Sequence, residues 1–536
     1  MKADLIVRRG RVYTVDPGRP WAEAVGCVGG RVVAVGRDED VLARAGPNTQ
    51  VVDAGGRLVL PGLTDGHVHL LWYAVSRRGH EVNLYGVGSI DELRRLVRHA
   101  VETADPGQWV YGRGWDESLW GVRPTRAYLD DIAPHTPVVL RRLDLHTSWA
   151  NGAALAQAGV TRETPDPPGS CLERDVDGEL TGILHEFGAI DLVEDHIPQP
   201  DAATLQGWLR DAIAEAHRLG VTGVLDMRLA NEGRQSFRLL QALNRRGELD
   251  LRVHMAIPAE SLAEAAALGL EPGFGDDRLW TGHVKVFADG SMGGGTAHML
   301  APFEDDPGNR GIAVTPPDEM RELARQADEA GFSLAVHAIG DRGIRDTIDV
   351  LCQFPRDGAT SGFKLPHLIE HVQLLHPDDL PRLSQHGIVA SMQPVHVLSD
   401  WRTADRVWGR RARYAYAFRS LIDRGTCMSF GSDAPYESFN PMEGIYAAVT
   451  RRDRGGEPEG GWYSEERISV AEAVRGYTVG PARATGRRRV QGAIRPGAWA
   501  DMIVLARDIF GIPPEEIAET EVDLTVFDGR VVFRAA

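Results

Sequence analysis

Eight strand-like apolar segments recur through the middle of this 536-residue chain, and amphipathic helical stretches separate most of them. The segments cover residues 58–69, 221–227, 251–257, 282–289, 333–340, 365–372, 387–393 and 428–433. Strands that alternate with helices favour a parallel sheet, because each helix carries the chain back to the edge where the next strand begins. Eight such units is the number that closes into a (β/α)₈ barrel. We therefore predict an α/β fold of the TIM-barrel class.

The two ends of the chain follow a different pattern. Apolar and polar side chains alternate between glycine-rich turns, as in antiparallel strands, in residues 4–7, 31–35, 50–53, 501–505, 524–527 and 530–533. We predict a small β-sandwich domain built from residues 1–60 and 488–536, with the barrel in residues 61–487. Residues 72–219 form an insertion after the first barrel strand. Its several tryptophans indicate either a lid over the barrel mouth or structural packing.

Charge and composition exclude several classes of protein. The net charge of −17 argues against nucleic acid or an anionic membrane as the main partner. Nowhere do about 18 apolar residues run together, so no membrane span is expected. The four cysteines are scattered, without a Cys-x-x-Cys pair, as is typical of free thiols in a reducing cytoplasm. We expect a cytoplasmic protein that acts on a small molecule, with a homodimer as its assembly.

Five of the eight predicted strands end in side chains of a type that binds metal ions. In chain order these are His67 and His69, Lys285, His337, His371 and Asp433. The spacing of two residues places both histidines of the first strand on one face, about 7 Å apart along the chain. Taken singly, each residue has a plainer explanation, as a hydrogen-bonded core histidine or as a carboxylate at a helix N-terminus.

Lys285 is the least expected member of this set. Alternation along its strand places Val284, Val286 and Ala288 on the helix-facing side, so Lys285 is predicted to point into the barrel. Burial disfavours the charged ammonium and so favours the neutral amine. A neutral amine can take up CO₂ to form a carbamate, which is an anionic bidentate ligand. The alternative is an ion pair between Lys285 and Asp289 or another carboxylate.

The six positions together make a stronger case than any one of them. In (β/α)₈ barrels the carboxyl ends of the strands converge on one site, so these side chains are predicted to meet there. Nitrogen and oxygen donors without a thiolate suit zinc, and also manganese, iron, cobalt or nickel. We predict two divalent metal ions about 3.5–4 Å apart, with zinc as the expected metal.

The chain also resembles a known family through several motifs in the right order. These are residues 60–69 (LPGLTDGHVH), 285–291 (KVFADGS), 337–342 (HAIGDR), 369–371 (IEH), 392–394 (MQP) and 431–435 (GSDAP). They resemble the amidohydrolase superfamily, in particular amidohydrolase family 3, the branch related to N-substituted formamide deformylase. Residues 293–296 read Gly-Gly-Gly-Thr, where members of that family often have Gly-Ser-Arg-Thr. The missing arginine leaves the substrate side of the pocket undefined.

The resemblance implies a role for each of the six residues. His67 and His69 would hold the more buried ion with Asp433, and His337 and His371 would hold the second. A CO₂-derived carbamate on Lys285 would bridge the two ions. The predicted activity is hydrolysis of a non-peptide C–N bond, in an amide, formamide or cyclic amide, by a metal-activated hydroxide. Asp433 would take the proton of the water and pass it to the leaving nitrogen.

Candidate contacts with the substrate follow from position near these motifs. They are Trp72, Tyr73, Trp115, His298, Gln393 and His396, with Trp120 as a further candidate. For the tryptophans far along the chain, core packing is the alternative. Residues 144–151 have counterparts in the family and are expected near the pocket, or else form a structural turn.

Three other functions remain open on the sequence. A deaminase of the same superfamily would use one metal and would not need Lys285 as a ligand. Ester or lactone hydrolysis would use nearly the same metal chemistry. A non-catalytic scaffold would keep the barrel without the chemistry, but such proteins usually lose ligands, and here all six positions are filled.

Overall fold

The computed structural model describes residues 2–77, 81–84, 87–105, 107–117, 120–142, 147–167, 170–198, 200–227, 233–356 and 365–535. The chain divides into two compact units. One unit combines Met1–Tyr73 with Leu209–Ala536, and the other is Ala74–Trp208. Among the described residues, no helix is both long enough and apolar enough to cross a membrane.

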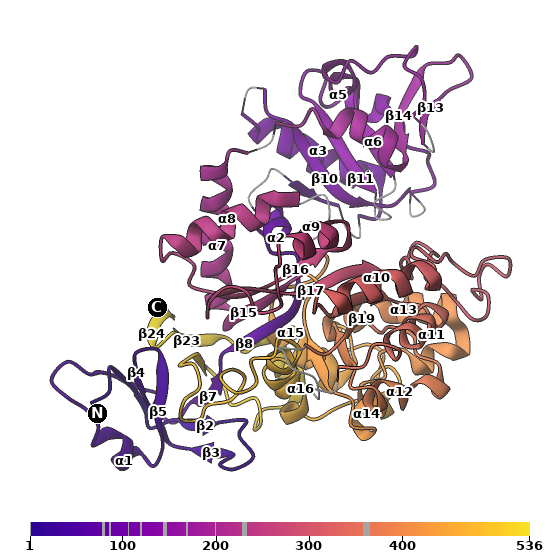
Figure 1. Ribbon diagram of the computed structural model, residues 1–536. Helices are drawn as coiled ribbons and strands as arrows, with labels where there is room; N and C mark the ends of the chain where they lie inside the picture. The colour runs from indigo at the N-terminus through magenta and orange to yellow at the C-terminus, as the bar shows by residue number, and fades with distance from the viewer. Residues whose placement is uncertain are drawn as a thin grey trace. The chain divides into compact units, whose positions relative to one another are not determined.

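An eight-stranded parallel sheet forms the centre of the first unit (Figure 1). Its strands are β8 (Leu63–Val68), β15 (Val221–Asp226), β16 (Arg252–Pro258), β17 (Leu279–Phe287), β18 (Leu334–Ala338), β19 (Leu368–His371), β20 (Val389–Met392) and β21 (Met428–Phe430). Each strand pairs with the next in chain order, from β8 to β21. Just beyond the strand ends, Asp433 N donates to His67 O at 2.8 Å and His69 N donates to Ala434 O at 2.9 Å. The predicted barrel is confirmed, with all eight strands where the apolar segments lie.

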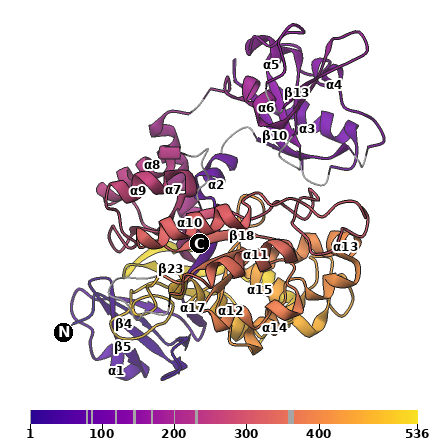
Figure 2. The ribbon, with the colours of Figure 1, turned by 45° about the vertical axis from the view of Figure 1, so that its right-hand side comes forward.

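Helices follow the barrel strands and cover the outside of the sheet (Figure 2). They are α7 (Ala202–Arg218), α8 (Gly233–Arg245), α9 (Leu262–Ala267), α10 (Pro317–Glu329), α11 (Asp341–Leu351), α12 (Arg382–Gln385), α13 (Val397–Trp408), α14 (Phe418–Asp423), α15 (Pro441–Thr450), α16 (Val470–Gly476) and α17 (Val479–Ala484). Their apolar faces bury against outward-facing strand residues such as Val284 and Val286 in one large core. A smaller apolar cluster that includes Ala335, Leu368 and Val389 lies on the opposite faces of the strands, inside the barrel.

Strands from both ends of the chain form two further sheets of the same unit. One has the order β5-β4-β1-β6 and the other β24-β23-β22-β7-β2-β3. Their bounds are β1 (Leu5–Arg8), β2 (Arg11–Tyr13), β3 (Trp21–Ala22), β4 (Ala24–Val28), β5 (Arg31–Gly36), β6 (Gln50–Asp53), β7 (Leu58–Pro61), β22 (Met502–Leu505), β23 (Val522–Phe527) and β24 (Arg530–Arg534); helix α1 is Asp38–Leu42. Both sheets contribute to one apolar core, which joins Val7 and Val25 to Val59, Val504 and Val526.

The predicted first strand, residues 58–69, is two strands in the structure. β7 belongs to the terminal sheet and β8 to the barrel, and the chain passes between them at Gly62. A Cβ atom at Gly62 would lie 2.2 Å from the Oγ1 atom of Thr222, so no larger residue fits where the chain changes sheets. Periodicity alone does not reveal this change, because both strands are apolar and fully buried.

The second unit contains a six-stranded sheet with the order β13-β14-β12-β11-β10-β9. Its elements are β9 (Glu81–Asn83), β10 (Val110–Trp115), β11 (Val138–Arg142), β12 (Thr147–Ala150), β13 (Cys171–Arg174), β14 (Leu180–His185), α3 (Ile90–Thr103), α4 (Arg126–Asp130), α5 (Gly152–Gln157) and α6 (Glu186–Glu194). Trp115, Trp120 and Trp149 pack on one another, with ring centroids 5.7–6.4 Å apart. Trp115 also donates its indole N–H to Leu140 O. These tryptophans therefore help to form the core of this unit.

Candidate metal centre

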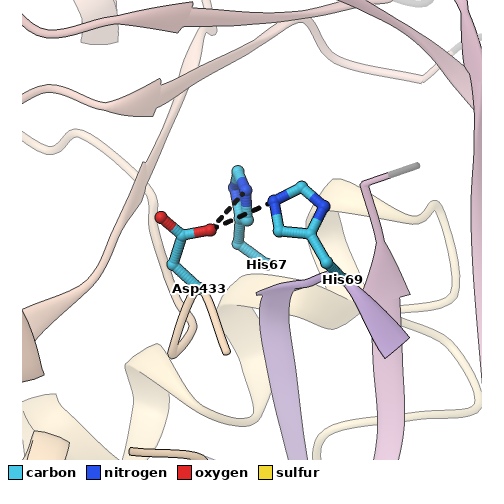
Figure 3. A group of neighbouring side chains, drawn as sticks. All are labelled: His67, His69 and Asp433. Atoms are coloured by element: carbon cyan, nitrogen blue, oxygen red, sulfur yellow. Dashed lines mark ion pairs between the residues drawn. The ribbon is translucent and has the colours of Figure 1, made fainter. Parts of the chain in front are cut away.

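Two histidines and one aspartate converge at the carboxyl ends of the first and last barrel strands (Figure 3). His67 is in β8, His69 follows it, and Asp433 lies just beyond β21. Asp433 Oδ1 is 3.3 Å from His67 Nε2 and 3.2 Å from His69 Nε2. Their ligand atoms all lie within 4.8 Å of one another, and all three residues are buried. The spacing suits three ligands of one metal ion.

The backbone around Asp433 is held in an unusual conformation. Asp433 has a φ of 61°, in the left-handed region that residues other than glycine rarely adopt. Asp65 supports this turn, because its Oδ1 accepts hydrogen bonds from His67 N and Ser432 N at 2.9 and 3.0 Å. Gly431 is equally constrained, since a Cβ there would lie 2.3 Å from His67 N. These contacts fix Asp433 against the strand that carries His67.

His337 and His371 extend the group to a second set of donors. Their rings lie 4.5 Å apart by centroid, and the His371 ring lies 4.9 Å from that of His67. His371 Nδ1 is 4.0 Å from Asp433 Oδ2. His337 Nε2 is 3.0 Å from Gly290 O. Because a carbonyl only accepts, Nε2 carries the proton, and Nδ1 of His337 is left with the lone pair that binds a metal.

His371 reaches the site through a break in strand alternation. In β19, Leu368 packs inside the barrel and Ile369 packs on the helix side, so regular alternation would place Glu370 inside and His371 outside. His371 and Val372 instead have φ values of 74° and 45°. This local left-handed backbone turns the side chain of His371 toward the same site as Glu370.

Lys285 is buried inside the barrel, with 3% of its surface exposed. Burial lowers the pKa of the Lys285 ammonium, although the nearby carboxylates of Glu370 and Asp433 oppose that effect. Within the described ranges, Lys285 has no carboxylate at ion-pair distance. Asp289 instead accepts three backbone N–H groups, from His298, Ile339 and Gly340, at 2.8–2.9 Å. The ion pair between Lys285 and Asp289, which the sequence left open, does not form.

The charge states of His337, His371 and Asp433 favour a bound cation. Burial lowers the pKa of His337 to about 3 and lowers that of His371 well below its usual range. Burial opposes ionisation of Asp433, but His67, His69 and His371 hold the pKa of its carboxyl well below the usual value. Neutral imidazoles and an ionised carboxylate are the forms that bind metal ions.

Two buried side chains orient the histidines. Glu370 Oε2 lies 2.6 Å from His67 Nδ1, and Gln393 Oε1 lies 2.8 Å from His371 Nδ1. Because both oxygens accept, each Nδ1 carries the proton and each Nε2 keeps its lone pair for a ligand. The sequence analysis gave no role to Glu370, although alternation in its strand and the cost of an unpartnered buried carboxylate were signals for one. Gln393 was predicted to contact substrate, and the structure places it against His371.

Unpartnered buried atoms in the cluster fit a metal ion. Among the residues that the structure describes, His67 Nε2 and Asp433 Oδ1 have no hydrogen-bond partner, although both are buried. Buried polar atoms nearly always have one. A nitrogen lone pair and a carboxylate oxygen that point at the same place are explained by a cation between them. The donors present therefore fit a divalent metal ion.

Some of the predicted substrate contacts lie beside the metal-ligand cluster, and others lie elsewhere. The Trp72 ring is 5.7 Å from that of His69, and His396 Nε2 is 3.8 Å from Asp433 Oδ2. Tyr73 packs on Phe439, and His298 faces Asp346 at 3.9 Å. Trp115 belongs to the other unit. Residues 143–146, part of the segment expected near the pocket, lie outside the described residues.

The sequence predicted no role for Tyr436, although its ring lies 5.9 Å from that of His69. It follows the Asp433 turn by only three residues. Aromatic residues commonly line pockets. The position of Tyr436 just after a predicted ligand was therefore the sequence signal for its place in the site.

Comparison with known proteins finds relatives over most of the chain. A family model described as the amidohydrolase family matches residues 50–533. Protein LONG AFTER FAR-RED 3 of Arabidopsis thaliana is 32% identical over 518 residues, covering 94% of this chain and 87% of that protein. N-substituted formamide deformylase of Arthrobacter pascens is 28% identical over 545 residues, covering 98% of this chain and 97% of that enzyme.

A solved structure is similar over nearly the whole chain. It is an uncharacterized metal-dependent hydrolase from Pyrococcus horikoshii, 27% identical to this chain, with a TM-score of 0.78. The similarity covers 95% of this chain and 99% of that one. The family model, over residues 50–533, includes every element that carries a residue of the cluster.

Proposed function

Because this chain belongs to the amidohydrolase family, we propose that it hydrolyses the C–N bond of a small amide, formamide or cyclic amide at a centre of two zinc ions. The chain is a metal-dependent hydrolase of non-peptide C–N bonds. One observation above all supports the proposed substrate class and the proposed pair of zinc ions. Donors from four barrel strands, His67 and His69 with Asp433, and then His371 and His337, form one continuous cluster.

We assign the ligands by their contacts. His67, His69 and Asp433 would hold one ion, because their donor atoms already converge. His337 and His371 would hold the second, through the ring nitrogens that their other hydrogen bonds leave available. Lys285, as a carbamate, would bridge the two ions, since it is buried beside the cluster without a carboxylate partner among the described residues.

Bound divalent ions would lower the pKa of water toward about 7 and polarise the carbonyl of the substrate. The remaining steps fall to the side chains of this chain. Asp433 would accept the proton of the attacking water at its carboxylate and return it to the leaving nitrogen. The hydrogen bond from His67 to Glu370 keeps that imidazole in one tautomer throughout. Trp72 and His396 border the cluster and would contact the substrate.

The name of one relative supports the reaction class. N-substituted formamide deformylase is similar over nearly its full length, and its name describes removal of a formyl group from nitrogen. The four cysteines are free, and we further propose a cytoplasmic protein that assembles as a homodimer.

A hydrolysis screen of the zinc-loaded protein tests the proposal. The panel should contain N-formyl amines, N-acyl amines, cyclic amides, carbamates and esters, with separate detection of ammonia. We expect turnover of a formamide or amide that chelation abolishes and zinc restores. Activity only on esters, ammonia release from an aminated ring, or turnover that survives chelation would each contradict the proposal.

A matched pair of variants separates the proton step from folding. Asp433→Asn keeps the shape of the side chain but removes the base, and should lose at least about 100-fold in kcat. Asp349→Asn, at a side chain that is 55% exposed and pairs with Arg382, is the control and should keep its activity. Near-native turnover of Asp433→Asn with both ions bound would refute the role of Asp433.

A further inference from the structure

A pocket lies at the opposite end of β21 from Asp433. It has a volume of about 480 Å³ and is lined by the start of β21, by α16 and α17, and by segments near residues 15–17 and 488–495. Small-molecule sites typically measure about 300–1,000 Å³. Barrel enzymes carry out their chemistry at the carboxyl ends of the strands, so this pocket, at the amino end of β21, is separate from the metal centre.

Four arginines line this pocket: Arg475, Arg483, Arg488 and Arg495. Within the described part of the chain, none of them has a carboxylate at ion-pair distance. The pocket also contains Glu472 and Asp16, but Glu472 pairs with Arg419 at 2.8 Å and Asp16 accepts the N–H of Gly18. In a chain of net charge −17, four arginines against two carboxylates make the lining of this pocket a local concentration of positive charge.

Two buried polar groups in the wall of the pocket also have no partner. Thr426 and Gln491 are 6% and 8% exposed, and among the described residues Thr426 Oγ1 and Gln491 Oε1 form no hydrogen bond. Gln491 is held in place because its Nε2 donates to Thr64 Oγ1 at 3.0 Å. Buried polar atoms usually form hydrogen bonds, so a molecule in the pocket would supply a hydrogen-bond partner for both atoms.

We propose that this pocket binds a small organic phosphate that carries two or more negative charges. A guanidinium group matches phosphate oxygens with two parallel hydrogen bonds, and four such groups favour a polyanionic head. Apolar side chains that include Ile422, Met428 and Val479 line the rest of the pocket and suit an uncharged body such as a nucleoside. Thr426 and Gln491 offer a hydroxyl and an amide oxygen to polar atoms of that body.

Cys427 offers a readout that does not depend on enzyme activity. It lines the pocket, and burial raises the pKa of its thiol while Arg483 and Arg475 oppose that effect, which places both arginines near the sulfur. A ligand held by these arginines should therefore shield Cys427 from alkylating reagents. Cys352 and Cys171, which do not line the pocket, serve as internal references.

The test is calorimetric titration of the zinc-loaded protein with ADP, inorganic pyrophosphate and uncharged adenosine. ADP should bind saturably and at least about tenfold more tightly than pyrophosphate, and adenosine should bind most weakly. Arg483→Gln and Arg488→Gln should each weaken ADP by about tenfold or more. Arg489→Gln is the matched control, because Arg489 is exposed beside these residues but does not line the pocket. ADP should also slow alkylation of Cys427 and not of Cys352.

Several outcomes would overturn the proposal. Failure of ADP to bind would overturn the assignment of an ADP site to this pocket. The same holds if Arg489→Gln weakens ADP binding as much as Arg483→Gln does. ADP binding that both pocket variants leave unchanged would place the anion elsewhere, for example on the metal ions. Equal affinities for pyrophosphate and ADP would refute an organic ligand. None of these results bears on the hydrolysis screen, which reports on the other end of the barrel.

Discussion

Glu370 Oε2 lies 2.6 Å from Nδ1 of His67, and both side chains are completely buried. The two residues are 303 positions apart in the chain. The carboxylate accepts the Nδ1 proton, so His67 presents Nε2 to Asp433 and to any ion between them. Glu370 is thus a positioning residue for the proposed metal centre.

Removing this carboxylate should weaken metal binding. In Glu370→Ala, His67 loses the partner that sets its tautomer, and zinc affinity should fall by about 10–100-fold. Glu370→Gln keeps an oxygen acceptor of the same shape and should lose less. The three proteins are dialysed against increasing concentrations of chelator, and elemental analysis measures the zinc that each retains. The amounts retained rank the three proteins by zinc affinity. Equal retention by all three would show that Glu370 does not orient the ligand.

Lys285 should carry a carbamate when metal is bound. Protein loaded with zinc in carbon-13-labelled bicarbonate should give a carbamate carbon signal in NMR. Lys285→Ala should lose that signal and at least about tenfold in activity, because the bridge between the ions is missing. Propionate, a free carboxylate, should restore part of the activity. A native protein with both ions and no carbamate signal would count against the bridge.

Gly431 should tolerate no side chain. A Cβ there would meet His67 N at 2.3 Å and Asp65 Oδ1 at 2.8 Å, and neither atom can move without disturbing the cluster. Gly431→Ala should cost about 1–3 kcal/mol in the free energy of unfolding, and should lower zinc content as well. In Gly207→Ala, within α7, the new Cβ meets nothing within 4 Å, and stability should rise by about 0.5–1 kcal/mol. Denaturant unfolding and zinc analysis compare the two variants; equal effects would refute the steric argument.

His254 should make stability depend on pH. It is fully buried, its Nε2 lies 3.0 Å from His283 Nδ1, and burial, with smaller contributions from His283 and Arg487, lowers its pKa well below 6.5. The imidazole takes up a proton near pH 6.5 in the unfolded chain but not in the folded protein. The contribution of His254 to the free energy of unfolding is therefore complete above pH 6.5 and is lost as the pH falls.

The matched variant isolates this effect. Below pH 6.5, the free energy of unfolding of His254→Leu should fall less steeply than that of the wild-type protein, by up to about 1.4 kcal/mol per pH unit for one proton. Urea unfolding at a series of pH values measures both slopes. Identical slopes would show that the imidazole is already protonated in the folded state.

Much of the site could be predicted from the amino-acid sequence. Apolar segments with alternating side chains predicted eight strands, and the same alternation placed Lys285 inside the barrel and Val284 and Val286 outside, as the structure has them. The residues that end those strands were predicted to meet because barrel topology brings the carboxyl ends together. In the structure His67, His69, His371, His337 and Asp433 form one cluster.

Other features depended on contacts between distant segments. Alternation would have placed His371 on the helix side, and only a left-handed backbone at that residue brings it to the cluster. The hydrogen bonds of His67 to Glu370 and of His371 to Gln393 join residues whose separation along the chain carries no periodic signal. The arginine pocket likewise joins the start of β21 to residues near both ends of the chain.

The amino-acid order thus settled which residues form strands and which side chains face inward, because both follow from local periodicity and burial of apolar surface. It also placed at the strand ends the residue types that we propose as metal ligands. The folded chain decided tautomers, hydrogen-bond partners and the conformations of Asp433 and His371. Those depend on contacts between segments that are far apart in the chain, and these contacts form only when the chain folds.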